Sequence, residues 1–469
     1  MGNPNKLTLS KLYKYFIIAV TGKESEFTTG SIRKAIFMLS IPMILEMLME
    51  SIFALVDIAY VSRVSVNAVA TIGLTESVIT LIYAIAIGLS MAATAIVARR
   101  IGEKNIKGAR ETAVQAILLG IAVALVTGVI GAFYAEDILG LMGGSKELIT
   151  EGKGYTSLMI GGNITILLLF LINAIFRGAG DASIAMWTLV LSNGLNIILD
   201  PIFIFGWGPI PEYGVLGAAI ATNIGRGSAV LFQLAILFFG WSRIKLQMSD
   251  LVIRLKVMTN LINVSLGGIA QFLIGTSSWI FLMRIMSEFG SEVLAGYTIA
   301  IRVMMFSLMP SWGMSNAAAT LVGQNLGANQ PNRAEISVWK TGKYNAIFMF
   351  LISLIYLCFA KDIIMFFNTT PKVVENGTLC LQIIAAGYVF YAYGMVLTQA
   401  FNGAGDTKTP TKINFLIFWV FQLPLAYLIA ITFNYGAIGV FIAIAVAEIL
   451  LTIISYILFK KGKWKEIQV

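Results

Sequence analysis

Two aspartates lie in stretches of the chain that are otherwise long and apolar enough to span a lipid bilayer. Asp57 is near the end of the first stretch and Asp200 near the end of the fifth. A carboxylate at bilayer depth costs about 2.5 to 3.5 kcal/mol on insertion scales, so such acids face a cavity and serve as ion or substrate sites. The positions of these two acids therefore predict a transporter.

The fifth stretch carries more polar chemistry around its aspartate. Asn193, Asn196 and Asp200 are spaced i, i+3 and i+7 and so share one face of a helix. Pro201 has no N–H, which leaves the carbonyl of Ile197 without its helical partner. A carboxylate, an amide and a free carbonyl together predict a site for a cation or a proton relay.

The first stretch has an acidic stripe of its own. Glu46, Glu50 and Asp57 are spaced i, i+4 and i+11. Two acidic stripes facing lipid would be prohibitive, so we expect both stripes to face the interior. No arginine is expected at comparable depth in this part of the chain, with the depth of Arg226 left open.

Composition assigns these stretches to a polytopic membrane protein, because 58% of the residues are hydrophobic and only 12% are charged. Apolar windows of about 20 residues predict an all-α protein with twelve transmembrane helices. The helices are expected near residues 35–60, 68–98, 112–134, 152–176, 184–206, 214–240, 258–286, 294–323, 340–360, 376–401, 411–434 and 436–459.

Lysine and arginine are concentrated in every second loop, which predicts that both termini are cytoplasmic. The net charge of +9 is then a consequence of topology and requires no nucleic acid. Three cytoplasmic segments are expected: residues 1–34, with an amphipathic surface run over 15–20; a linker over 241–257; and a tail over 460–469.

The chain repeats itself at a nearly constant offset. RGAGD at 177–181 recurs as NGAGD at 402–406, and Gly102 and Glu46 correspond to Gly327 and Gln271, each pair 225 positions apart. GVLGAAIA at 214 corresponds to GAIGVFIA at 436. Six helices followed by six related ones predict two pseudo-symmetric lobes, an N-lobe over 35–240 and a C-lobe over 258–459.

Polar residues of the N-lobe are missing from the C-lobe at the same offset. Leucines stand opposite Asp57 and Asp200, and Phe421 stands opposite Asn196. Acids and amides are therefore expected in the N-lobe only, as a site added to one lobe. The GAGD segments, present in both lobes, favour a structural role as tight turns.

A broader cavity for aromatic ligands is a second possibility, with core packing as the alternative for most of its members. Its candidates are Glu50, Gln271, Trp279, Met305, Tyr391 and Gln399.

Enzymatic chemistry has no support in the sequence. The chain has no histidine, no metal-ligand cluster, no phosphate-binding loop and no nucleophile with a base, so we expect neither an enzyme nor a nucleotide-driven pump. No resident cofactor is expected, and the two cysteines are interpreted as packing residues.

The paired RGAGD and NGAGD segments, LNIILDPIFIFGWG at 195–208 and SIPMILE at 40–46 resemble the multidrug and toxic compound extrusion (MATE) exporters over roughly residues 30–460. The pattern is similar to the prokaryotic branch with its cation site in the N-lobe, and not to the branch with acids on helices 7 and 10. The resemblance implies that the cation is bound by Asp57, Tyr155, Asn173, Asn196, Asp200 and Thr222, with Asp57, Asn196 and Asp200 holding Na⁺ if sodium is the ion.

The resemblance implies antiport by a monomer in the plasma (inner) membrane, surrounded by lipid. Entry of H⁺ or Na⁺ would drive export of small organic, mostly cationic and amphipathic compounds by alternating access. We hypothesise that a cation cancels the repulsion between Asp57 and Asp200, helix 1 bends, and the drug cavity closes. The alternative is a lipid-linked oligosaccharide flippase of the same superfamily, which predicts a cationic cavity; only Arg226 and Arg302 are candidates for it.

Overall fold

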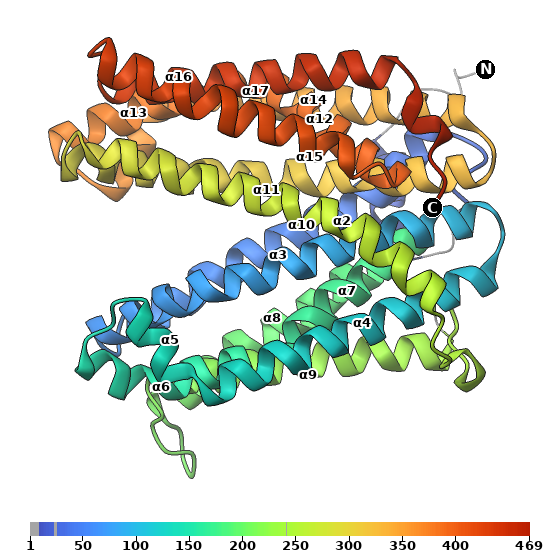
Figure 1. Ribbon diagram of the computed structural model, residues 1–469, viewed down its shortest axis with the longest axis horizontal. Coiled ribbons are helices and arrows are strands. Elements are labelled where there is room, and N and C mark those ends of the chain that lie inside the picture. The colour runs from blue at the N-terminus through green and yellow to red at the C-terminus, as the bar shows by residue number, and fades with distance from the viewer. Residues whose placement is uncertain (1–8, 23–25, 241) are drawn as a thin grey trace.

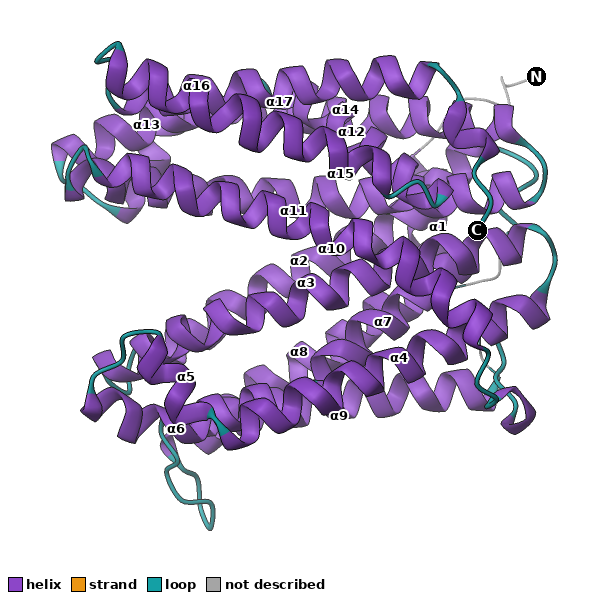
Figure 2. Ribbon diagram, in the orientation of Figure 1, coloured by secondary structure: helices purple, strands orange, loops and turns teal. Residues whose placement is uncertain are grey.

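The computed structural model describes residues 9–22, 26–240 and 242–469. This part of the chain is helical almost throughout and contains no strand beyond an isolated bridge between Trp207 and Ile210 (Figure 2). Eleven helical segments are long and apolar enough to cross a membrane, and a bent helix pair makes a twelfth if it counts as one span. The predicted all-α fold with twelve spans is confirmed.

The nine α-helices described before the linker comprise α1, in the N-terminal segment, and the eight helices α2 to α9 of the N-lobe. They are α1 (Leu9–Thr21), α2 (Ile32–Val61), α3 (Val66–Gly102), α4 (Ile106–Phe133), α5 (Ala135–Leu141), α6 (Lys146–Gly161), α7 (Ile164–Ala179), α8 (Ala182–Phe205) and α9 (Val215–Phe239).

The C-lobe begins after a short 3₁₀ turn, η1 (Met248–Asp250). It contains α10 (Leu255–Ser287), α11 (Ser291–Gly327), α12 (Pro331–Phe367), α13 (Pro371–Ala385), α14 (Tyr388–Ala404), α15 (Lys408–Asn414), the π-helical η2 (Phe415–Gln422), α16 (Leu423–Tyr427), the π-helical η3 (Leu428–Thr432), α17 (Ala437–Lys460) and the 3₁₀ turn η4 (Lys463–Glu466).

The fourth and tenth spans are interrupted at corresponding positions. The fourth breaks between α6 and α7 at Gly162 and Asn163, and the tenth bends by 58° between α13 and α14 near Gly387. Gly162 and Gly387 are again 225 positions apart. We predicted each of these spans as a continuous helix, and the structure corrects this.

The lobes contact each other through helices that the repeat relates. α2 packs along α11 of the other lobe, and α10 packs along α3. Figure 1 shows the two lobes close together at the end that carries the C-terminus and diverging toward the end that carries α5, α6 and α13.

Two glycines allow the close approach at that end. A Cβ atom on Gly102 of α3 would lie 2.0 Å from the carbonyl oxygen of Gln324 in α11. A Cβ atom on Gly327 of α11 would lie 2.1 Å from the carbonyl oxygen of Arg99 in α3. Both glycines belong to the repeat, so the same feature in each lobe closes this end.

The terminal segments pack against the lobes. The indole of Trp187 donates a hydrogen bond to the carbonyl of Val20 in α1 (2.9 Å). Trp464, in the predicted tail, is buried and stacks on Phe459 with ring centroids 4.6 Å apart. The guanidinium of Arg99 donates to the carbonyl of Ile467, which links the tail to the N-lobe.

Candidate functional site

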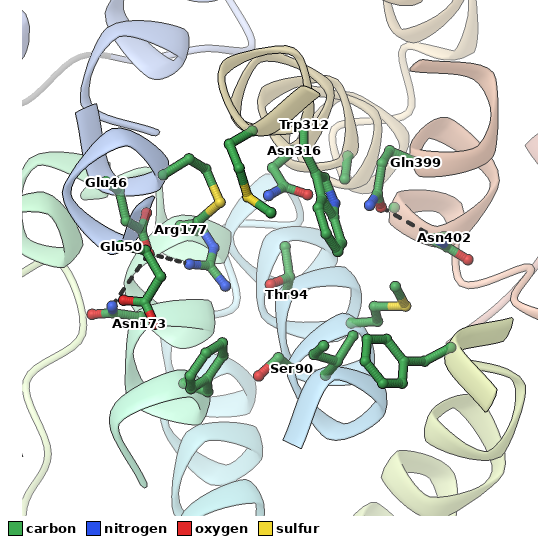
Figure 3. A pocket seen from close by; sticks show the side chains of 18 of the residues that line it. Glu46, Glu50, Ser90, Thr94, Asn173, Arg177, Trp312, Asn316, Gln399 and Asn402 are labelled. Atoms are coloured by element: carbon green, nitrogen blue, oxygen red, sulfur yellow. Dashed lines mark hydrogen bonds and ion pairs between the residues drawn. The ribbon is translucent and has the colours of Figure 1, made fainter. Parts of the chain in front are cut away.

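A cavity of about 240 Å³ lies between the two lobes. The N-lobe contributes its walls from α2, α3, α7 and α8, and the C-lobe contributes them from α10, α11 and α14. Its apolar lining includes Met47, Met91, Phe170, Phe272, Met309 and Trp312, and Figure 3 shows the polar side chains that face them. The cavity is therefore largely apolar with a few polar groups, as small-molecule sites are.

An ion pair lies in the N-lobe wall of this cavity. Arg177 Nη1 is 2.5 Å from Glu46 Oε1, and both side chains are largely buried. The amide of Asn173 donates to the same Glu46 oxygen at 3.2 Å and accepts from the amide of Gln233 at 2.7 Å (Figure 3). Glu46 Oε2 is buried without a hydrogen-bond partner, so the carboxylate keeps capacity for a further donor.

The C-lobe wall has an uncharged counterpart. The amide of Gln271 donates to Asn402 Oδ1 at 3.0 Å and to the carbonyl of Thr407 at 3.1 Å. Asn402 donates to Gln271 Oε1 at 3.2 Å and to Gln399 Oε1 at 3.4 Å. Asn402 and Gln399 line the cavity (Figure 3).

A separate polar cluster lies around Asp200 inside the N-lobe. The amide of Asn196 donates to Asp200 Oδ1 at 3.2 Å and to the hydroxyl of Thr222 at 3.1 Å. All three side chains are buried, because α8 and α9 pack closely along this face. Asp200 Oδ2 and Asn196 Oδ1 are buried without a partner.

Asp57 and Tyr155 complete this cluster from two other helices. Asp57 on α2 interacts electrostatically with Asp200 and with Tyr155, which is buried on α6. Asp57 Oδ1 is also buried without a partner. Three orphaned oxygens, two of them from carboxyl groups, fit a proton or a hard cation such as Na⁺, which takes oxygen ligands.

The six predicted cation-site residues therefore fall into two places. The structure brings Asp57, Tyr155, Asn196, Asp200 and Thr222 to one part of the N-lobe. It places Asn173 in the wall of the cavity, hydrogen bonded to Glu46.

The six predicted cavity residues are divided as well. Glu50 and Gln399 line the cavity, and Gln271 lies behind Asn402. Trp279 and Tyr391 pack against the core of the C-lobe, and the side chain of Met305 is 38% exposed.

The structure settles one question about charge that the sequence left open and overturns one expectation. Arg226, on α9, is only 7% exposed and does lie at the depth of the acids, with its guanidinium 3.2 Å from the hydroxyl of Tyr83. Glu448 is buried in α17, so acids are not confined to the N-lobe. Helical spacing carries a signal for Arg226, because it is four residues after Thr222 on the same face.

Sequence reasoning missed Arg177 and Asn402 as cavity residues because both belong to segments interpreted as turns. The turn interpretation is right for the glycines: Gly180 and Gly405 end their helices with φ of 92° and 88°. Arg177 and Asn402, the first residues of the RGAGD and NGAGD segments, instead point their side chains into the cavity.

Comparison with known proteins gives a consistent result. The sequence model of the MatE family matches the chain twice, over residues 42–202 and 268–428. A Thermotoga maritima protein described as probable multidrug resistance protein NorM is 28% identical, covering 93% of this chain and 94% of that protein. The multidrug export protein MepA of Staphylococcus aureus is 21% identical, and the match covers 90% of this chain and 92% of the MepA chain.

A solved structure agrees with the sequence matches. The crystal structure of MATE in complex with MaL6 superposes with a TM-score of 0.87 at 26% identity, covering 94% of this chain and 99% of that chain.

Proposed function

Because the chain belongs to the MatE family and is thus a multi-pass membrane transporter and not an enzyme, we propose that it exports small organic cations in exchange for H⁺ or Na⁺. The observation that carries this proposal is the acidic charge on the cavity wall. Glu46 is neutralised by Arg177, whereas Glu50 forms no ion pair within the described residues and lines the same cavity.

The charge balance of the cavity supports a cationic substrate. Two glutamates and one arginine face it, which leaves one negative charge among methionine and aromatic side chains. A monocation with an aromatic body would meet a counter-charge at Glu50 and apolar contacts at Trp312 and Phe170. Cations are also attracted to the faces of aromatic rings.

The Asp200 cluster supports coupling to an inward-moving cation. Asp57 and Asp200 repel each other, and each has a buried oxygen without a partner. A proton or Na⁺ bound there would remove the repulsion and favour a conformation in which α2 and α8 lie closer together. A ligand shifts a conformational equilibrium only by its differential affinity for the two states, so the cation and the organic substrate must favour different states.

The test is ethidium uptake into inside-out vesicles that contain the protein, driven by an imposed pH or sodium gradient. We expect gradient-driven uptake from wild-type protein, its loss in Asp200→Asn, and an unchanged rate in Asp362→Asn, which makes the same substitution at an exposed position of α12. The gradient that works identifies the coupling ion. Equal uptake by Asp200→Asn and wild type would refute ion coupling at this cluster.

The lipid-linked oligosaccharide flippase is the competing proposal for the same experiment. It requires a cavity that attracts a pyrophosphate, but the arginine in the cavity wall is paired with Glu46. Folded wild-type protein that takes up no ethidium under either gradient would favour the flippase.

We also propose that the protein acts as a monomer in the plasma (inner) membrane with both termini in the cytoplasm. α1 and the C-terminus lie toward the same end of the molecule, opposite α5 and α6 (Figure 2). That arrangement is the one expected of twelve spans with the basic loops inside.

A further inference from the structure

Arg226 lies between the cavity and the Asp200 cluster. On α2, Glu50, Phe53 and Asp57 are spaced i, i+3 and i+7 and share one face. The guanidinium of Arg226 sits over the ring of Phe53, 5.5 Å from its centroid. It therefore faces α2 midway between Glu50, which lines the cavity, and Asp57, which belongs to the cation cluster.

A second helix holds the guanidinium at this position. Arg226 Nη2 donates to the hydroxyl of Tyr83 on α3 at 3.2 Å, and the ring of Tyr83 packs against Phe170 in the cavity wall with centroids 5.5 Å apart. Arg226 Nη1 is buried without a hydrogen-bond partner. One nitrogen is thus fixed, and the other is available for a different partner.

The charges around Arg226 come from three helices. The titratable groups that interact with it electrostatically are Glu50, Asp57, Glu76, Tyr83 and Tyr155. None of the carboxylates among these groups forms an ion pair of 4.0 Å or less with Arg226 within the described residues. Arg226 is therefore a buried cation that lies near several acids without a close ion pair to any of them, and it acts as their shared counter-charge.

We propose that Arg226 couples the cation site at Asp57 and Asp200 to the substrate site at Glu50. This inference rests on the proposed function. When a cation occupies the Asp57 site, the guanidinium is attracted less to Asp57 and more to Glu50, where it competes with the organic cation. By thermodynamic reciprocity, an organic cation at Glu50 drives Arg226 toward Asp57 and weakens binding of the coupling cation there. Arg226 is a positioning residue in this scheme and is not transported.

The test is a titration of the purified full chain with ethidium, followed by fluorescence anisotropy. Titrations are made in sodium chloride and in potassium chloride at equal ionic strength, and at two pH values. For wild type we expect the coupling cation to weaken ethidium binding about tenfold, within the range of known allosteric factors. In Arg226→Gln we expect tighter ethidium binding without the coupling cation. We also expect the ratio of the ethidium dissociation constants with and without the coupling cation to be close to one.

Two matched variants separate coupling from a structural role. Arg226→Lys keeps the positive charge and is expected to restore most of the tenfold ratio. Arg302→Gln makes the same neutralising substitution at an exposed position of α11 and is expected to leave the ratio unchanged. A purely structural arginine would alter affinity in both conditions equally.

Each outcome decides the proposal. An Arg226→Gln protein that keeps the tenfold ratio overturns the coupling role and leaves the proposed function standing, whereas wild-type protein that binds no ethidium overturns both. If Arg226→Gln does not fold, Tyr83→Phe removes the hydrogen bond that fixes the guanidinium and is expected to reduce the ratio to about fivefold, the lower end of that range of factors. An unchanged ratio in Tyr83→Phe would then refute the proposal.

Discussion

The two lobes keep the same side-chain contact and differ in its charge. In the N-lobe, Glu46 pairs with Arg177 at 2.5 Å; in the C-lobe, Gln271 and Asn402 exchange hydrogen bonds of 3.0 and 3.2 Å. Both members of one pair are related to those of the other by the 225-residue offset. A neutral contact thus suffices to join these helices, so the charge in the N-lobe has a role beyond joining them.

The energetics of buried ion pairs lead to the same conclusion. Desolvation of two charges offsets much of their attraction, and replacement of a buried pair by neutral groups is often nearly neutral in stability. The Glu46–Arg177 pair lies in the cavity wall, where its charges can respond to a ligand. The difference between the lobes indicates that the repeat supplies the scaffold and the N-lobe supplies the ion chemistry.

The largest effect that distinguishes the lobes is expected from alanine at the two corresponding positions. Arg177→Ala leaves the buried Glu46 without its cation, which should reduce the free energy of unfolding by roughly 3 to 5 kcal/mol. Asn402→Ala leaves Gln271 with its bond to Thr407 and should reduce it by about 1 to 2 kcal/mol. Denaturant unfolding of both purified variants in detergent measures the difference.

A double substitution provides the control for this comparison. Glu46→Gln with Arg177→Asn gives the N-lobe the residues of the C-lobe, and we expect it to recover most of the stability lost in Arg177→Ala. Additive losses from the two single substitutions would contradict the view that the pair acts as one unit.

A smaller loss of stability, similar in the two lobes, is expected from substitutions at the turn that occurs once in each lobe. Gly180 and Gly405 have φ of 92° and 88°, a conformation that costs other residues about 1 to 2 kcal/mol. Gly180→Ala and Gly405→Ala should therefore destabilise the protein to a similar extent in denaturant unfolding. Each loss should exceed this backbone cost, because the added methyl group would also meet a neighbouring side chain, Phe27 at 2.7 Å and Val469 at 2.1 Å. Gly275→Ala, within α10 and with open space around the added methyl group, should be neutral or stabilise by up to about 1 kcal/mol. Clearly unequal losses at the two turns would show that the lobes differ in structure as well as in charge.

The twelve spans could be predicted because apolar length alone defines a membrane helix. The breaks at Gly162 and Gly387 could not, since both lie inside apolar windows that read as continuous helices. The repeat contained a signal for them, because the two glycines are related by the offset that relates the GAGD turns.

The sequence predicts which residues of the candidate site share a helix face. It does not predict which residues of different helices lie at the same depth. The spacing of Asn196 and Asp200 placed them on one face, and the structure joins them with Thr222. Asn173 lies deeper toward the closed end, beside Glu46, because spacing within one helix does not fix its register against another. Arg177 was missed because its segment was interpreted as a turn, whereas it lies in the last turn of α7 and its long side chain reaches back to α2.

The smallest effect is expected at the position where the lobes carry opposite charges. Glu448 is 222 residues after Arg226, the offset that relates the starts of α9 and α17. Its side chain is 9% exposed and forms no ion pair among the described residues. A carboxyl group without a cation gains little from its charge, so Glu448→Gln should change the free energy of unfolding by no more than about 1 kcal/mol, toward greater stability. Gradient-driven ethidium uptake should stay within about twofold of wild type. A loss of uptake as complete as that expected for Asp200→Asn would mean that the C-lobe carries a coupling acid of its own, and the division of ion chemistry between the lobes would have to be abandoned.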